Sequence, residues 1–295
     1  MVGGVAVAGN VLGVAWTASR GHVFLFDLEA QQRVSAWVLP DGPAGYSDAA
    51  GLAIDEHYHV FVSDPHQGRV WHWNAFGRLL GTLGQAPPVD GDAGRDRPGV
   101  LDRPYAVAVR GDLVYVAGGD QPRRRAVQRF TRQGTLLRPL ASHGDAAQCF
   151  GAPRGLFADD QGLLVADTLH GTIQRFRGDG TYVGEWRCQA RRDGNGERVR
   201  PAAVVRRPDG GVVFLDRGDH CGLAGLGPDG RPWPLPSDVA ARCVDPVALA
   251  GDRKGRLYVL DHGGERVIRF TAALQFDREV CDLREQLGDY SPLLS

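Results

Sequence analysis

Short apolar runs alternate with turn-forming residues along the whole chain, and residues 153–186 show this pattern most clearly. Four strand-length runs follow one another there, with Asp-Asp-Gln-Gly, Asp-Thr-Leu-His-Gly and Gly-Asp-Gly between them. The runs are 156–158, 163–166, 172–176 and 182–186. Such runs and turns predict a four-stranded antiparallel meander. A meander of this kind does not bury both of its faces alone, so the pattern predicts further copies packed beside it.

The same pattern recurs about every 49 residues through the chain. The small residues that begin the first run of each copy are Gly4, Gly51, Ala106, Gly155, Ala203 and Ala248. The six copies span approximately 1–47, 48–102, 103–151, 152–199, 200–244 and 245–295. Because they account for nearly the whole sequence, we expect one domain over residues 1–295.

The four runs of each copy differ in character. First runs are small and apolar, as expected for strands that converge on an axis, and second runs are rich in β-branched and aromatic residues. Third runs alternate apolar and polar residues, and fourth runs are expected to be outermost and more exposed. Glycines at 77, 134, 180 and 230 mark the turn between the third and fourth runs. These features predict an all-β fold, a six-bladed β-propeller of four-stranded antiparallel blades. The chain starts at an inner strand and ends after an outer one, which is compatible with closure without an exchanged strand; an edge cover from the tail or the first residues is the open alternative.

The motifs of the copies resemble the NHL repeat. The copy at 152–199, which reads PRGLFAD…LLVAD…HGTIQRF…GDG, resembles this repeat best. The segments GLAID…VFVSDPHQGRVWHW and LYVLDHGGERVIRF resemble it well. The resemblance covers essentially the full chain and implies a six-bladed propeller. Propellers of this kind serve as interaction modules and RNA-binding surfaces, and related six-bladed enzymes are lyases and lactonases, so the resemblance implies a fold more sharply than a function.

Charge and cysteine content narrow the functional classes. The formal net charge is −1, which leaves no global field to attract nucleic acid or an acidic membrane. The five cysteines are widely spaced and form no C-x-x-C pair, so neither a zinc site nor a disulfide framework is predicted. The opening MVGGVAVAGNVLGVAW matches the repeat and lacks a basic start, which favours a strand over a signal peptide. With no apolar run long enough to span a membrane, we expect a cytoplasmic protein.

Two polar columns recur at the ends of the second runs. Asp64, Asp167, Asp216 and Asp261 form the first column, and His22, His66, His170, His220 and His262 form the second. The recurrence predicts that each aspartate accepts backbone N–H bonds in its own turn, and this aspartate belongs to the NHL consensus. Equivalent positions on different blades diverge from the axis, so we expect the histidines to lie too far apart for a shared zinc ion. No metal site is predicted.

The residues just before or at the start of the first runs are the predicted site. They are Asp48, Arg103, Tyr105, Arg154, Arg200 and Asp245, and a propeller directs such positions toward one mouth of its central channel. Arginine offers a bidentate fork to a carboxylate. The leading hypothesis is therefore a non-enzymatic binding or scaffold module that engages a protein partner or a small anionic ligand there. The competing interpretation is that these residues pair with one another and solvate the rim.

A propeller lyase or hydrolase with its site in the channel, possibly using Ca²⁺, is the alternative function. The related amidating lyases take zinc-binding histidines from the inner-strand entrances, and this chain has none there. No nucleophile–base pair is evident in the sequence, so the enzyme hypothesis is the weaker one. No cofactor is predicted for the binding module.

Nucleic-acid binding is a third and less favoured hypothesis. Its basis is two arginine clusters, 123–125 with Arg129, and Arg191, Arg192, Arg198 and Arg200. Few aromatic residues interleave with these clusters, and nearby acidic residues reduce their field. The longest linker, residues 83–104, is rich in Pro, Gly and Asp and is either a binding loop at the mouth or an ordinary insertion.

Overall fold

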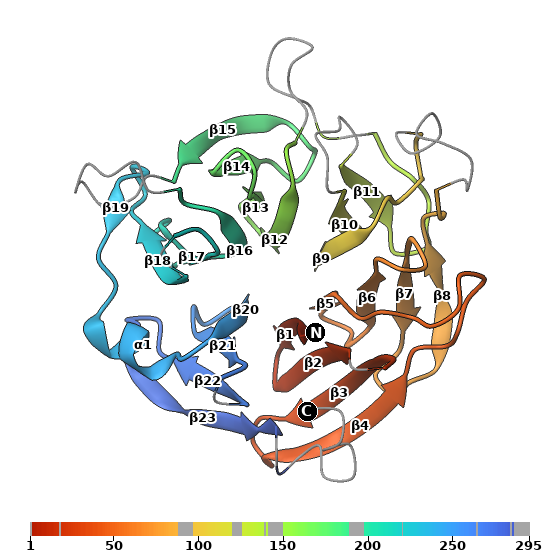
Figure 1. Cartoon of the computed structure of the whole chain (residues 1–295), viewed down its shortest axis with the longest axis horizontal. Helices are drawn as coiled ribbons and strands as arrows, with labels where there is room; N and C mark the ends of the chain where they lie inside the picture. The colour runs from red at the N-terminus through yellow and green to blue at the C-terminus, as the bar shows by residue number, and fades with distance from the viewer. Residues whose placement is uncertain are drawn as a thin grey trace.

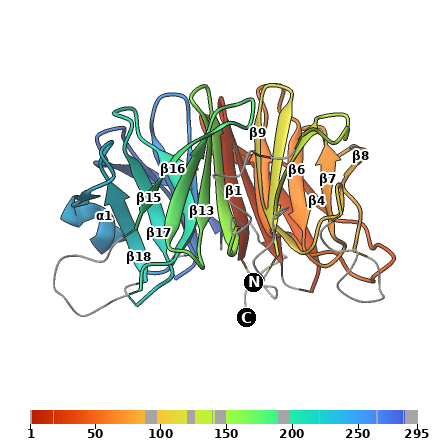
Figure 2. The same ribbon diagram turned by 90° about the horizontal axis from the view of Figure 1, so that it is seen from above.

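The computed structural model is a ring of six antiparallel sheets around a central axis (Figure 1), and Figure 2 views this ring from its rim. The structure describes residues 2–17, 19–87, 97–119, 126–138, 140, 150–188, 198–219, 221–263, 265–283 and 285. Each sheet is built from strands consecutive in the chain, so the predicted six-bladed β-propeller is confirmed.

The first three blades contain the first eleven strands. Blade one comprises β1 (Val2–Ala8), β2 (Val11–Thr17), β3 (Gly21–Asp27) and β4 (Gln32–Val38). Blade two comprises β5 (Gly51–Ile54), β6 (Val60–Asp64), β7 (Arg69–Trp73) and β8 (Leu79–Leu83), and blade three comprises β9 (Pro104–Arg110), β10 (Leu113–Gly118) and β11 (Val127–Thr131). In blade three a single bridge, Phe130–Leu136, continues the sheet outward. Much of the fourth run expected there lies outside the described residues.

The last three blades have four strands each. Blade four comprises β12 (Pro153–Asp159), β13 (Gly162–Asp167), β14 (Thr172–Phe176) and β15 (Tyr182–Arg187). Blade five comprises β16 (Pro201–Arg206), β17 (Val212–Asp216), β18 (Gly222–Leu226) and β19 (Pro232–Trp233), and blade six comprises β20 (Pro246–Gly251), β21 (Leu257–Asp261), β22 (Arg266–Phe270) and β23 (Phe276–Asp282).

A short helix, α1 (Ser237–Arg242), lies between blades five and six, where the sequence pattern predicted none. Its Val239 is fully buried in the apolar cluster between these two blades, so one anchored side chain holds the helix against the ring. None of the described helices is long and apolar enough to cross a membrane.

The hydrophobic core lies between the blades. Each apolar cluster joins two neighbouring sheets, and such clusters connect every adjacent pair around the ring. A blade therefore buries both of its faces, which is why the second strands are apolar at nearly every position. One cluster joins blade six to blade one, with Tyr258 and Val267 against Phe24 and Trp16. Within the described residues no strand is exchanged across this seam, and side-chain packing closes it.

Small residues begin the inner strands because adjacent backbones meet there. A β-carbon on Gly155 would lie 2.6 Å from Cα of Ala203, and one on Gly51 would lie 2.7 Å from the carbonyl oxygen of Tyr105. Both distances are shorter than real β-carbons allow, so a larger residue would push neighbouring blades apart. The size restriction predicted for this column is confirmed.

Candidate functional site

The aspartates that end the second strands hold the chain as it enters each blade. All four are buried, and each accepts a bond from a backbone N–H sixteen positions earlier. The N–H of Asp48 donates to Asp64 at 3.1 Å, that of Gly151 to Asp167 at 2.8 Å, that of Arg200 to Asp216 at 2.7 Å and that of Asp245 to Asp261 at 2.7 Å. Asp64 and Asp216 also accept N–H bonds from their own turns, as predicted. The column thereby fixes the backbone of three predicted site residues, Asp48, Arg200 and Asp245.

The structure brings three of the six predicted site residues together. Tyr105 on β9 and Arg154 on β12 lie on neighbouring inner strands, and the guanidinium carbon of Arg154 is 3.7 Å from the centre of the Tyr105 ring. The guanidinium carbon of Arg103 lies 5.6 Å from the same ring. Arg103 is exposed, whereas Tyr105 and Arg154 are half-buried. A phenol with two guanidinium groups thus stands at the mouth where the inner strands begin.

The other predicted residues have different neighbours. Asp245 lies 3.5 Å from the guanidinium of Arg217, an ion pair that crosses from blade six to blade five. Asp48 and Arg200 are tied to their own blades through their backbone N–H groups, and their side chains are partly exposed and exposed, respectively. One carboxylate of the rim is therefore paired, but with an arginine outside the predicted set.

The histidine column has separate local partners rather than a common ligand. His66 Nε2 is 2.9 Å from the carbonyl oxygen of Ala44, and His170 Nδ1 is 3.0 Å from the Asp167 carboxylate. His262 contacts the Trp16 ring. His22 was expected in the loop before the third strand of its blade. It lies within β3 instead, because β3 begins at Gly21. His220 lies outside the described residues.

Two further sets of candidate residues are the metal-ligand types and the arginines of the two basic clusters. Among the described His, Cys, Asp and Glu residues no group of three is placed to hold a metal ion. Arg129 is buried and donates to the carbonyl oxygens of Arg138 and Gly178, so its predicted place in a phosphate-binding patch is wrong. Arginines 123–125, 191 and 192 lie outside the described residues.

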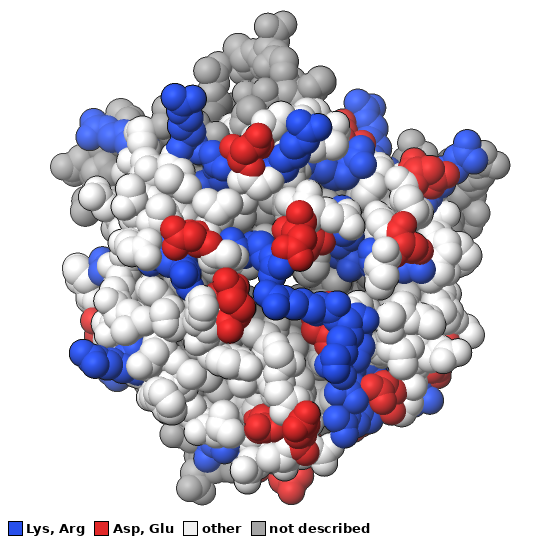
Figure 3. Space-filling view, turned by 180° about the vertical axis from the view of Figure 1, so that it is seen from behind, with Lys and Arg blue, Asp and Glu red and all other residues white. Residues whose placement is uncertain are grey.

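The opposite mouth of the channel carries charges that the sequence analysis did not single out. Figure 3 shows this face, on which basic and acidic side chains gather around the centre. Arg110 of blade three pairs with Asp160 of blade four, and Arg206 Nε of blade five donates to Asp159 at 2.7 Å. The Arg110 hydrogen bond and charge lower the pKa of Asp160. Ion pairs therefore link three successive blades at this mouth.

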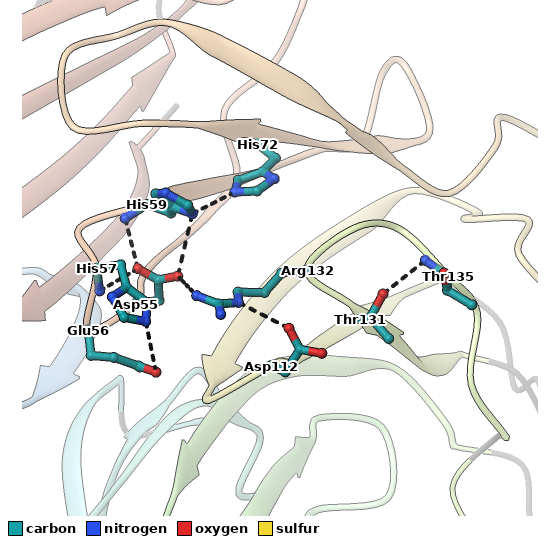
Figure 4. Close-up of polar contacts among 9 residues, drawn as sticks. All are labelled: Asp55, Glu56, His57, His59, His72, Asp112, Thr131, Arg132 and Thr135. Atoms are coloured by element: carbon teal, nitrogen blue, oxygen red, sulfur yellow. Dashed lines mark hydrogen bonds and ion pairs between the residues drawn. The ribbon is translucent and has the colours of Figure 1, made fainter.

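A cluster of histidines and acidic residues around Arg132 lies at the seam between blades two and three (Figure 4). His72 Nε2 on β7 is 3.2 Å from His59 Nδ1. Burial, and to a smaller extent the charge of the neighbouring His59, lowers the pKa of His72 to about 4. The buried Asp55 accepts a 3.0 Å bond from Arg132, whose Nε donates to Asp112 at 3.2 Å. The sequence signal for this cluster is the HYH and WHW motifs, in a copy that holds four of the nine histidines.

A hollow of about 670 Å³ opens beside this cluster. Its walls are His57, His59 and His72, the β8 segment 80–83, and the blade-three turn at Arg132 and Gln133. None of the six predicted site residues lines this hollow. Only packing of blade two against blade three creates it, so the order of residues within one repeat did not reveal it.

Comparisons with known proteins agree on the fold. No protein-family model matches the sequence, and no curated protein matches it. A protein of unknown function from Bacteroides caccae is similar over 94% of this chain and 95% of its own, with 12% identity and a TM-score of 0.60. Virginiamycin B lyase from Staphylococcus aureus is similar over 94% of this chain and 83% of its own, with 14% identity and a TM-score of 0.59.

A protein complex provides a third similar structure. A chain of the nidogen/laminin complex is similar over 91% of this chain and 92% of its own, with 20% identity and a TM-score of 0.58. At these identities the likeness establishes the propeller fold and leaves the activity open.

Proposed function

We propose that this NHL-like propeller is a binding module that holds an anionic group at the mouth where its inner strands begin. The ligand is either an acidic side chain of a protein partner or a small carboxylate. The observation that carries this proposal is the meeting of Arg103, Tyr105 and Arg154 on adjacent blades. Two guanidinium groups beside one phenol ring place positive charge at a partly exposed position.

Stacking and carboxylate binding are compatible in this arrangement. Arg154 uses the flat face of its guanidinium against the Tyr105 ring, while its N–H donors lie in the plane of the group. A ring contact also limits the rotation of a long side chain, so less entropy is lost when a carboxylate binds. The similar chain from the nidogen/laminin complex supports a binding role for a propeller of this shape.

The backbone of Arg103 adds a second support. Its φ is +49°, in the left-handed region that glycine occupies more easily. A non-glycine residue held in such a conformation costs about 1–3 kcal/mol. Keeping arginine at an exposed position despite this cost is consistent with a use for its side chain.

The proposal is tested with a panel of mono-, di- and tricarboxylates and a pentaglutamate peptide. Thermal shift identifies compounds that stabilise the full chain, and calorimetry measures their affinity. We expect Arg154→Gln to weaken binding at least tenfold, since one charge-assisted bidentate contact contributes about 1.5–3 kcal/mol. Arg231→Gln, which changes an exposed arginine of β-turn 227–231 on the opposite face, is the control and retains binding. Equal affinity of wild type and Arg154→Gln would refute the proposal.

The similarity to virginiamycin B lyase favours one second candidate, a lyase or hydrolase with its site in the same channel. Tyr105 would then be the proton donor or acceptor beside Arg154. Incubation with virginiamycin B, followed by mass spectrometry of the antibiotic, tests this. Turnover by the wild type that is lost in Tyr105→Phe would establish catalysis in place of simple binding.

Calcium does not fit this mouth well. Ca²⁺ requires six to eight oxygen ligands. Asp48 and Asp245 are the acidic residues predicted there, and Asp245 already lies 3.5 Å from Arg217. No step of the alternative is therefore assigned to a metal ion.

A further inference from the structure

The outer strand of blade two is unprotected compared with its counterparts. β8 (Leu79–Leu83) ends its sheet, and within the described residues no strand pairs with its other edge; the neighbouring chain pairs only at the Gln85–Val100 bridge. Proteins normally block such edges with charge or proline. Inside the fourth strands, β4 contains Arg33, β15 contains Glu185 and Arg187, β19 contains Pro232, and β23 contains Asp277, Arg278 and Glu279. β8 contains none of these residue types, and its one flanking charge is the exposed Arg78 directly before it.

The exposed surface of β8 is apolar. Leu79 is 40% exposed and Leu80 is 45% exposed, and Phe76 in the preceding turn is 90% exposed. Apolar side chains gathered beside an unpaired edge are typical of an interaction site rather than of a solvated rim. The blade-three turn comes near the carbonyl oxygen of Thr82, which leaves the first half of the strand as the accessible part.

Gly81 opens the hollow beside this edge. In β8 it pairs with His72 of β7, and a β-carbon built on it meets no atom within 4 Å. Its φ does not lie in the left-handed region, so the backbone does not require glycine there. Glycine at position 81 therefore provides space in the hollow and is not required by the backbone conformation.

The wall across the hollow offers hydrogen-bond donors. Arg132 is the only permanently charged residue among the described residues that line it. Two of its five N–H groups form ion pairs with Asp112 and Asp55, and within the described residues the other three have no acceptor. Asp55 is buried and does not line the hollow, so an occupant meets the guanidinium and the imidazoles of His57 and His59.

We propose that this groove binds an extended peptide segment of a partner protein. The peptide backbone pairs with the accessible edge at Leu79–Gly81, and an apolar side chain packs on Leu80. An aspartate or glutamate side chain enters the hollow above Gly81 and accepts hydrogen bonds from Arg132. Unpaired main-chain groups select an extended strand, and the donor-lined wall selects an acidic residue. This site is separate from the channel mouth.

The test uses a random heptapeptide phage library panned on the immobilised full chain. We expect enrichment of sequences with one acidic residue among apolar or β-branched ones. Fluorescence polarisation with an enriched synthetic peptide then measures affinity for three variants: Gly81→Leu, which fills the hollow, Leu80→Ser, which removes the apolar contact, and Val183→Ser. Val183 is the matched control because it is 50% exposed on β15, another fourth strand.

The peptide should bind Gly81→Leu and Leu80→Ser at least tenfold more weakly than wild type and bind Val183→Ser equally well. Changing its acidic residue to Gln or Asn should weaken binding to wild type by a similar factor. Absence of enrichment, or equal affinity for wild type and Gly81→Leu, overturns the proposal. So does a dimer of the wild type that Leu80→Ser dissociates in light scattering, since the occupant would then be a second copy. Unchanged binding in Arg154→Gln separates this site from the channel mouth.

Discussion

Asp64 provides a direct measure of how much the aspartate column stabilises the ring. Its buried carboxylate accepts backbone N–H bonds from Asp48, His66 and Gln67 at 3.0–3.1 Å and the Trp71 Nε1–H bond at 2.9 Å. Gln67 and Trp71 are buried, so water does not readily replace the carboxylate for their two donors. Each donor left unsatisfied costs about 1–2 kcal/mol, so Asp64→Ala should lower the free energy of unfolding by about 2–4 kcal/mol.

Urea unfolding followed by tryptophan fluorescence measures this change. Asp64→Asn keeps one acceptor oxygen but can place an N–H group against Trp71, so we expect a smaller loss of about 1–2 kcal/mol. Asp229→Ala removes an aspartate from an exposed turn, where it accepts one N–H bond from Arg231. This control should change the unfolding free energy by less than about 0.5 kcal/mol. An Asp64→Ala variant as stable as the control would refute the structural role assigned to the column.

Two further predictions concern Arg103 and His72. Arg103→Gly should leave the fold as stable as wild type or raise its unfolding free energy by up to about 1 kcal/mol, because the strain that glycine relieves at this positive φ is partly offset by the larger chain entropy that glycine loses on folding; a clear loss in urea unfolding would contradict this. The lowered pKa of His72 predicts stability that is present above pH 6.5 and lost as pH falls toward 4, since the unfolded chain takes up the proton first. Between pH 7.5 and 5, His72→Phe should therefore lose less unfolding free energy than wild type, and an equal loss would count against the assignment.

The amino-acid sequence predicted the repeat, and through it most of the fold. Six copies with small first runs, apolar second runs and glycine turns are local features, and strand hydrogen bonding and side-chain alternation respond to local pattern. The role of Asp64 and its column was predictable for the same reason, because a recurring residue in a turn bonds nearby backbone groups. In contrast, α1 was missed, because its burial depends on the space between blades five and six.

The sequence selected residues around one mouth but did not indicate which of them meet. Arg154 reaches Tyr105 because β9 and β12 are neighbouring inner strands, whereas Asp245 pairs with Arg217 of the blade before it. These contacts depend on the direction in which each side chain leaves a twisted sheet.

The hollow beside β8 was beyond the reach of the sequence. Gly81, His72 and Arg132 come from two copies, and nothing in their spacing indicates that they share a cavity. By itself, the sequence determined the number of blades, the order of strands and the residues that hold each turn, because these follow from interactions within one repeat. The tertiary structure decided which residues meet at the channel mouth and that a hollow exists beside β8, because both arrangements form where the surfaces of separate blades pack together.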